Sequence, residues 1–129
     1  MENTVTRHAV LDPVDGVLVH ANHYLAPELL SEERSPEHHR TNSQFRYARM
    51  TALLAENQGQ LNPERLQSLY RDRANVPNAL CRCPGDDPES DTITFASVIA
   101  KPSSGTDTSC AGRDRDFCIF ILTGWHRPA

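Results

Sequence analysis

The order of secondary-structure signals along the 129 residues predicts an α+β fold. A β-hairpin is expected within the first 20 residues, two helices between residues 43 and 70, and two or three antiparallel strands after residue 92. The length suits one domain, and strands and helices grouped in this order are typical of a layered structure.

Two apolar segments flanking a turn predict the N-terminal hairpin. Thr4–Leu11 (TVTRHAVL) has the composition of a strand, and Asp12–Gly16 (DPVDG) combines a proline that fixes φ with a permissive glycine. Val17–His20 is expected to be the second strand, and it runs into the polar sequence His-Ala-Asn-His at residues 20–23. An apolar strand with such an end is suited to delivering polar side chains into a site.

The middle of the sequence predicts a loop followed by two helices. Ala26–Asn42 is polar, contains prolines and lacks periodicity, so a long surface loop is expected there. In Ser43–Glu56 apolar residues recur at helical intervals, and Thr41 and Gln44 have capping-box spacing. The Asn-Pro pair at 62–63 predicts the start of a second helix, with the two helices packed as a pair against a sheet.

Apolar segments near the C-terminus predict the remaining strands. Thr92–Ala100 (TITFASVIA) is apolar on both faces, which calls for cover on both sides, and Phe117–Leu122 (FCIFIL) is a second strand. Thr108–Ala111 is a candidate third strand. Two short helices cannot cover two such strands. Residues 1–129 are therefore expected to be a single partial domain of a larger layered structure.

Composition limits the classes of partner. The formal net charge is −4, with 38% hydrophobic and 23% charged residues, so a nucleic-acid partner is not expected. The sequence has no apolar run long enough to span a membrane and no apolar signal region at its start, which predicts a cytoplasmic protein without a membrane partner. Reduced, structural thiols are expected for the four cysteines, Cys81, Cys83, Cys110 and Cys118.

Three motifs together resemble a known family. They are VHANHYL at residues 19–25, R-x-x-R-M at Arg46–Met50, and VPNALCR at residues 76–82. In this order and spacing they are similar to the C-terminal part of isopenicillin N acyltransferase-like enzymes, the acyl-CoA:6-aminopenicillanic acid acyltransferases. These are N-terminal-nucleophile (Ntn) hydrolases, also classed with cysteine peptidases. The resemblance extends from the predicted N-terminal hairpin to the predicted strand Phe117–Leu122 (FCIFIL).

The resemblance implies a fold and a chemistry. The fold would be the C-terminal portion of a four-layer αββα sandwich, and the reaction acyl transfer or amide hydrolysis through a thioester on an N-terminal cysteine. By similarity, Asn22 matches the asparagine that stabilises the oxyanion, and Arg82 matches an active-site arginine. His20 and His23 are expected to position Asn22 structurally.

The family's nucleophile and its acidic partner have no counterpart in this sequence. The chain alone is therefore expected to be inactive. Its partner would be the N-terminal half of the same enzyme or an upstream-encoded subunit, its substrate a small amide or acyl-CoA, and no cofactor is implied.

Other interpretations of these residues stay open. Asn22 could hydrogen-bond to a strand end or a turn, and Arg82 could be an ordinary surface or ion-pair residue. Arg46 and Arg49 form either a solvated helix face or a contact to the phosphates of CoA. A non-catalytic structural or metal-binding module is the alternative function, its candidate ligands being His20, His23, His38, His39, Cys81 and Cys83.

Overall fold

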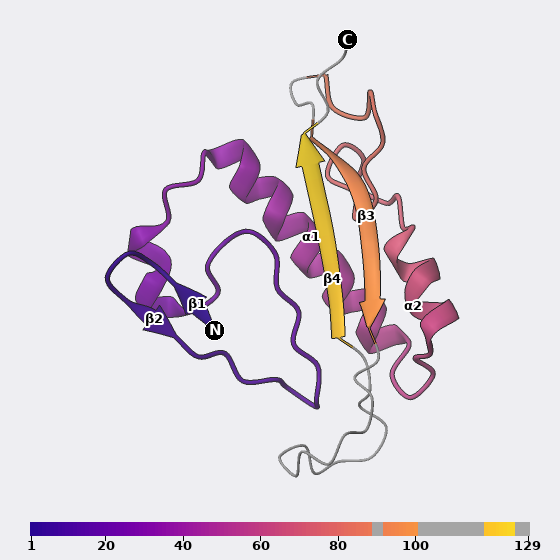
Figure 1. The fold of residues 1–129 in the computed structure, drawn as a ribbon, viewed down its shortest axis with the longest axis horizontal. Helices are drawn as coiled ribbons and strands as arrows, with labels where there is room; N and C mark the ends of the chain where they lie inside the picture. Colours follow the sequence, from indigo (N-terminus) through magenta and orange to yellow (C-terminus); the bar gives the residue numbers. More distant parts are fainter. Residues whose placement is uncertain (89–91, 101–117, 126–129) are drawn as a thin grey trace. The chain divides into compact units, whose positions relative to one another are not determined.

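The computed structural model describes residues 1–88, 92–100 and 118–125 (Figure 1). The chain divides into two compact units, Met1–Glu56 and Asn57–Ala129, and each is described by itself. Helices and antiparallel strands both occur, so the predicted α+β class is confirmed. The prediction that the chain is one partial domain stays a prediction.

The N-terminal unit opens with a very short hairpin. Strand β1 (Glu2–Asn3) pairs antiparallel with β2 (His8–Ala9), and the chain reverses between them. The Thr4 hydroxyl oxygen accepts hydrogen bonds from the amide of Thr6 at 3.3 Å and the amide of Arg7 at 3.0 Å. A threonine that bonds ahead to the backbone in this way stabilises a turn.

An N-terminal hairpin is therefore present, but the residues predicted for its two strands are wrong. Thr4–Leu11 is not one strand, because its first residues form the turn between β1 and β2. The segment 17–20 is not a strand either, although an isolated bridge joins Val14 and Val17 around the turn. Asp15 and Gly16 at this turn have φ values of 50° and 76°, a backbone conformation that glycine favours.

The segment 26–42 is also more ordered than the expected loop. It contains a 3₁₀ helix, η1 (Pro27–Glu32), and the first residues of helix α1 (Glu37–Glu56). The Arg40 amide donates to the Pro36 carbonyl at 3.0 Å, so the helix starts well before Thr41 and the predicted capping box is wrong. Leu29 of η1 is fully buried, which supplies the tertiary packing that stabilises this short helix.

The C-terminal unit follows the sequence prediction closely. Helix α2 (Pro63–Tyr70) begins after the Asn62 cap, whose Oδ1 accepts the Arg65 amide at 2.8 Å. Leu66, Leu69 and Tyr70 are buried, and α2 packs against strand β3 (Thr92–Ala100).

Strand β3 pairs antiparallel with β4 (Cys118–Trp125). This confirms the strand predicted over 92–100, and β4 contains residues 118–122 of the second predicted strand. The candidate strand at 108–111 lies outside the described residues.

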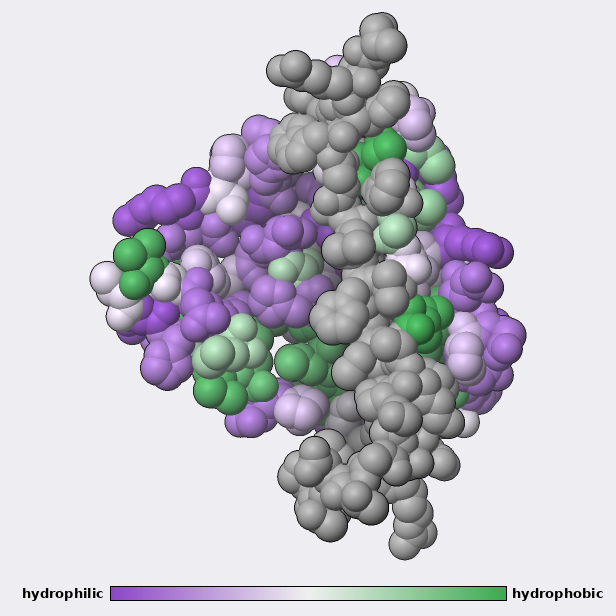
Figure 2. Space-filling view, in the orientation of Figure 1, coloured by the Kyte–Doolittle hydropathy of each residue, from purple (hydrophilic) through white to green (hydrophobic). Residues whose placement is uncertain are grey.

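The visible surface of the N-terminal unit is largely hydrophilic, with apolar side chains in separate small groups (Figure 2). Val5, Val10 and Val14 are among its exposed apolar residues. Within the described ranges, no helix combines the length and the apolar character needed to cross a bilayer.

Candidate functional site around Asn22

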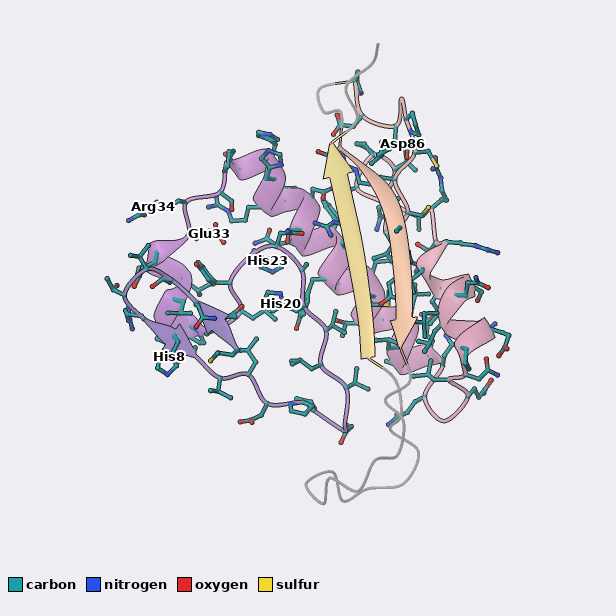
Figure 3. The ribbon with its side chains drawn as sticks, in the orientation of Figure 1. His8, His20, His23, Glu33, Arg34 and Asp86 are labelled. Carbon is teal, nitrogen blue, oxygen red and sulfur yellow. The ribbon has the colours of Figure 1, made fainter. Side chains whose placement is uncertain are left out.

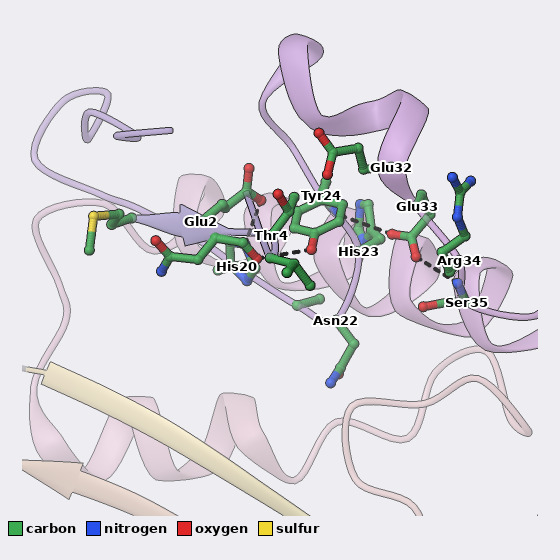
Figure 4. Close-up of a pocket in the computed structure, with 14 residues that line it drawn as sticks. Glu2, Thr4, His20, Asn22, His23, Tyr24, Glu32, Glu33, Arg34 and Ser35 are labelled. Atoms are coloured by element: carbon green, nitrogen blue, oxygen red, sulfur yellow. Dashed lines mark hydrogen bonds and ion pairs between the residues drawn. The ribbon is translucent and has the colours of Figure 1, made fainter. Parts of the chain in front are cut away.

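A buried carboxylate fixes the polar segment that the sequence singles out. Glu2 is only 4% exposed, and its two carboxylate oxygens accept the amides of Leu25 at 2.7 Å and Ala26 at 2.8 Å. His20 Nε2 lies 2.7 Å from the same carboxylate (Figure 4). Both ends of the segment 20–26 are thus attached to strand β1.

The charge of Glu2 is stabilised by these contacts. Burial by itself raises the pKa of the Glu2 carboxyl, but the hydrogen bonds from Leu25, Ala26 and His20 outweigh it, so the pKa lies below its usual value. Glu2 therefore acts as an ionised anchor for the backbone.

Helix α1 holds the middle of the segment through Ser43. Ser43 is 1% exposed, and its Oγ accepts the backbone N–H of Asn22 at 2.6 Å. The same Oγ lies 2.7 Å from His23 Nδ1. Because the hydroxyl already accepts from Asn22, its own proton is available to a neutral His23 ring. Burial, aided by the charge of His20, lowers the pKa of His23 and favours this neutral form.

The side chain of Asn22 is held by a second residue of α1. Arg46 Nη2 donates to Asn22 Oδ1 at 2.8 Å, and Arg46 Nε donates to Asn42 Oδ1 at 2.9 Å. A guanidinium has only donors, so it must face the amide oxygen and leaves Nδ2 as the outward group. Within the described residues Nδ2 has no hydrogen-bond partner, and Figure 4 shows the amide nitrogen pointing away from its own ribbon.

A pocket of about 620 Å³ lies beside this segment. Its walls come from residues 1–5, 20–24 and 32–35, all of the N-terminal unit (Figure 4). Glu33 shapes one wall, because its carboxylate accepts the amides of Tyr24 at 3.2 Å and Ser35 at 2.8 Å. The volume falls in the range of small-molecule sites.

Arg82, the second predicted site residue, is buried in the C-terminal unit. It is 6% exposed, and its Nη2 pairs with Asp87 Oδ2 at 3.1 Å. Its backbone is fixed to Thr94 at the start of β3 by two hydrogen bonds of 3.0 Å, one in each direction. The Arg82 Nε–H is buried and lacks a hydrogen-bond partner within the described residues. Such a donor is costly to leave unpaired.

The structure brings together only some of the predicted site residues. His20, Asn22 and His23 lie in one loop, where Figure 3 labels the two histidines. Asn22 and Arg82 belong to different units, so the site predicted to contain both stays a prediction.

Two supporting residues of this loop, Glu2 and Ser43, were not singled out from the sequence, and Arg46 was considered there only as a solvated residue or a CoA contact. Ser43 and Arg46 stand three positions apart on one helix, which puts them on the same face. That spacing, next to the R-x-x-R-M motif that contains Arg46, is a sequence signal that could have identified them as a pair.

The described residues also bear on the metal-binding alternative. No group of three or more His, Cys, Asp or Glu side chains that could hold a metal ion occurs within the described parts of the chain. Cys81 and Cys83 are free thiols, and burial raises the pKa of Cys81. Cys110, one of the remaining cysteines, lies outside the described residues.

Comparison with known proteins identifies one family. A model of the acyl-coenzyme A:6-aminopenicillanic acid acyl-transferase family matches residues 2–116. Searches of curated proteins and of solved structures return no match.

Proposed function

Because the chain belongs to the acyl-coenzyme A:6-aminopenicillanic acid acyl-transferase family, we propose that it is the C-terminal part of a cysteine Ntn-hydrolase. The enzyme transfers an acyl group or hydrolyses an amide through a thioester. The nucleophilic cysteine comes from a segment outside these 129 residues, and the chain alone is inactive. The family match over residues 2–116 and the α+β order of elements support this proposal, in which the described strands belong to an αββα sandwich.

The proposed reaction is an addition followed by an elimination. The cysteine Sγ attacks the carbonyl carbon of a small amide or acyl-CoA, its proton passes to the cysteine's own α-amine, and the carbonyl electrons move onto oxygen. When this oxyanion collapses, the bond to the leaving amine or thiolate breaks and the leaving group takes the proton from the α-ammonium. The resulting thioester is then attacked by water or by an acceptor amine.

The outward Nδ2 group of Asn22 is the observation that carries the proposal. Arg46 occupies Oδ1 at 2.8 Å, so the amide presents its N–H₂ group as a donor. A donor fixed before the reaction strengthens its bond as the carbonyl oxygen becomes an anion. Removal of one such donor costs about 10²–10³ in rate.

Arg82 is proposed to support the same reaction electrostatically. Its guanidinium is buried, and its Nε–H has no hydrogen-bond partner among the residues that the structure describes, which suits it to a partner supplied by the missing segment. A permanent positive charge beside a cysteine favours the thiolate and the anionic intermediates.

Co-expression with the segment encoded upstream tests the proposal. The probe is a fluorescent β-lactone, which acylates cysteine through a tetrahedral oxyanion: the ring C–O bond breaks and the freed alkoxide takes the proton. Asn22→Ala is expected to slow this acylation by about 10²–10³-fold. Gln67→Ala, which removes an exposed amide from α2, is the matched control and leaves the rate unchanged.

A second probe separates the oxyanion role from general damage. A chloroacetamide alkylates the same cysteine without forming an oxyanion, so Asn22→Ala should leave its rate unchanged. Arg82→Gln should slow both probes, because it affects the thiolate itself. Equal β-lactone rates in wild type and Asn22→Ala would overturn the oxyanion role, and absence of any labelled cysteine in the upstream segment would overturn the proposed enzyme class.

A further inference from the structure

One face of helix α1 holds Asn22 by both its backbone and its side chain. Ser43 Oγ accepts the Asn22 amide at 2.6 Å, and Arg46 Nη2 donates to Asn22 Oδ1 at 2.8 Å. The two residues are three positions apart, and Asn42, one turn before Arg46, holds the guanidinium through Nε at 2.9 Å. We propose that Arg46 is a positioning residue that makes the Asn22 amide an oxyanion donor. This inference rests on the proposed function.

The need for positioning follows from the chemistry of a carboxamide. Its oxygen and its NH₂ group have nearly the same shape, so an exposed Asn22 without a partner would turn either one outward. An outward oxygen would repel the developing oxyanion. In the flipped orientation, the amide's N–H groups would meet those of Arg46, donor against donor. Arg46 therefore excludes the inactive orientation.

The contact also strengthens the donor. A positive charge at Oδ1 draws electron density away from Nδ2, which makes the Nδ2 protons better hydrogen-bond donors. Ser43 adds to this by fixing the Asn22 backbone from a position that is 1% exposed. The amide is thus oriented before the substrate arrives, which is the condition for stabilising a transition state without reorganisation.

The other interpretation of Arg46, a contact to the phosphates of CoA, fits the structure less well. Two of its donors, Nη2 and Nε, already bond to Asn22 and Asn42. A phosphate that took both would release the Asn22 amide, the opposite of what the proposed reaction needs.

Kinetics of the co-expressed enzyme with the β-lactone probe give the first test. Arg46→Met nearly keeps the length of the side chain but has no donor, and it should lower the maximal acylation rate by no more than the about 10²–10³-fold that loss of the donor itself costs. The probe concentration at half-maximal rate should stay constant. Arg46→Lys should recover part of the rate, and Arg40→Met on the same helix is the control that leaves it unchanged.

A double variant shows whether Arg46 acts through Asn22. In the Asn22→Ala background, Arg46→Met should have no further effect, because there is no amide left to orient. An equal, independent loss in both backgrounds would overturn the positioning role. Slow acylation in Asn22→Ala with normal acylation in Arg46→Met would overturn this inference and leave the proposed function standing.

A spectroscopic measurement tests the orientation without any activity. In the ¹⁵N-labelled 129-residue chain, the two Nδ2 protons of Asn22 should move upfield in Arg46→Met, toward the shifts of a solvated asparagine. Arg40→Met should leave them in place. Unchanged Nδ2 signals in Arg46→Met would overturn the inference whatever the outcome for catalysis.

Discussion

Glu2 holds both ends of the Asn22 segment. It is buried, and it accepts two backbone amides, those of Leu25 and Ala26. Glu2→Gln would turn an NH₂ group toward one of these donors and leave a buried amide unpaired. We expect the free energy of unfolding to fall by about 1–3 kcal/mol, measured by urea denaturation. Glu28→Gln, an exposed carboxylate in η1, should have little effect, and equal losses in the two variants would contradict the anchoring role.

The two described thiols should differ in reactivity. Cys83 is exposed, whereas burial raises the pKa of Cys81 and leaves less thiolate at a given pH. Iodoacetamide at pH 8 should therefore alkylate Cys83 first. Trypsin cleaves after Arg82 and separates the two cysteines, so peptide mass spectrometry measures each rate. Faster alkylation of Cys81 would contradict the burial that the structure gives it.

At the level of elements, the start of α2 depends on one side chain. Asn62 Oδ1 accepts the Arg65 amide at 2.8 Å, which pairs a backbone donor that the helix itself cannot satisfy. Asn62→Ala is expected to lower the free energy of unfolding by about 1 kcal/mol in a denaturant titration. Asn62→Asp keeps the acceptor and should retain most of the stability. A loss of the same size in Asn62→Asp would mean that the cap is not the cause.

The elements that the sequence predicts well are those with local signals. The Asn-Pro pair at 62–63 is a local signal for a helix start, and α2 begins there. The apolar segment 92–100 is a local signal for a strand, and β3 has these bounds. By contrast, η1 depends on the burial of Leu29, which no periodicity in 26–42 indicates. Likewise, the composition of Thr4–Leu11 predicts a strand, but the Thr4 side chain stabilises a turn at the start of this segment.

The candidate site likewise has one residue that a local motif reveals and others that only the tertiary structure reveals. Asn22 is recognisable because it stands in a compact His-Ala-Asn-His motif. Glu2 and Ser43, which hold that motif, lie 18–24 and 20–21 residues from the groups they contact. Contacts over such separations depend on the tertiary fold, which short motifs and periodicity do not specify.

At the scale of the whole chain, both compact units belong to the region that matches the family, because residues 2–116 include Asn22 and Arg82. The proposed function thus gives a role to one residue of each unit, and it assigns the nucleophilic cysteine to a segment outside the 129 residues. For this reason, substitutions at Asn22, Arg46 and Arg82 are expected to change the rate of β-lactone acylation, while the acylated cysteine itself is expected in the upstream segment.

The stability of the chain should rise with pH between acid and neutral conditions. Three groups of the N-terminal unit, Glu2, His23 and Glu33, have lowered pKa values. For His23 the first cause is burial, and for the two carboxyls hydrogen bonds outweigh the burial that raises the pKa. The folded state then binds fewer protons than the unfolded state, so the free energy of unfolding increases with pH.

The pKa values set the two pH windows of this effect. The His23 contribution is complete above its unfolded pKa of 6.5 and is lost as pH falls through the lowered folded value. The contribution of the Glu2 and Glu33 carboxyls is complete above their unfolded pKa of 4.5, and it is lost as pH falls through their lowered folded pKa values. Urea denaturation at intervals between pH 8 and pH 3, followed by circular dichroism, should show both declines. His23→Gln should remove the upper decline and keep the lower one, and a constant free energy of unfolding between pH 7 and pH 5 in the wild type would contradict a neutral, buried His23.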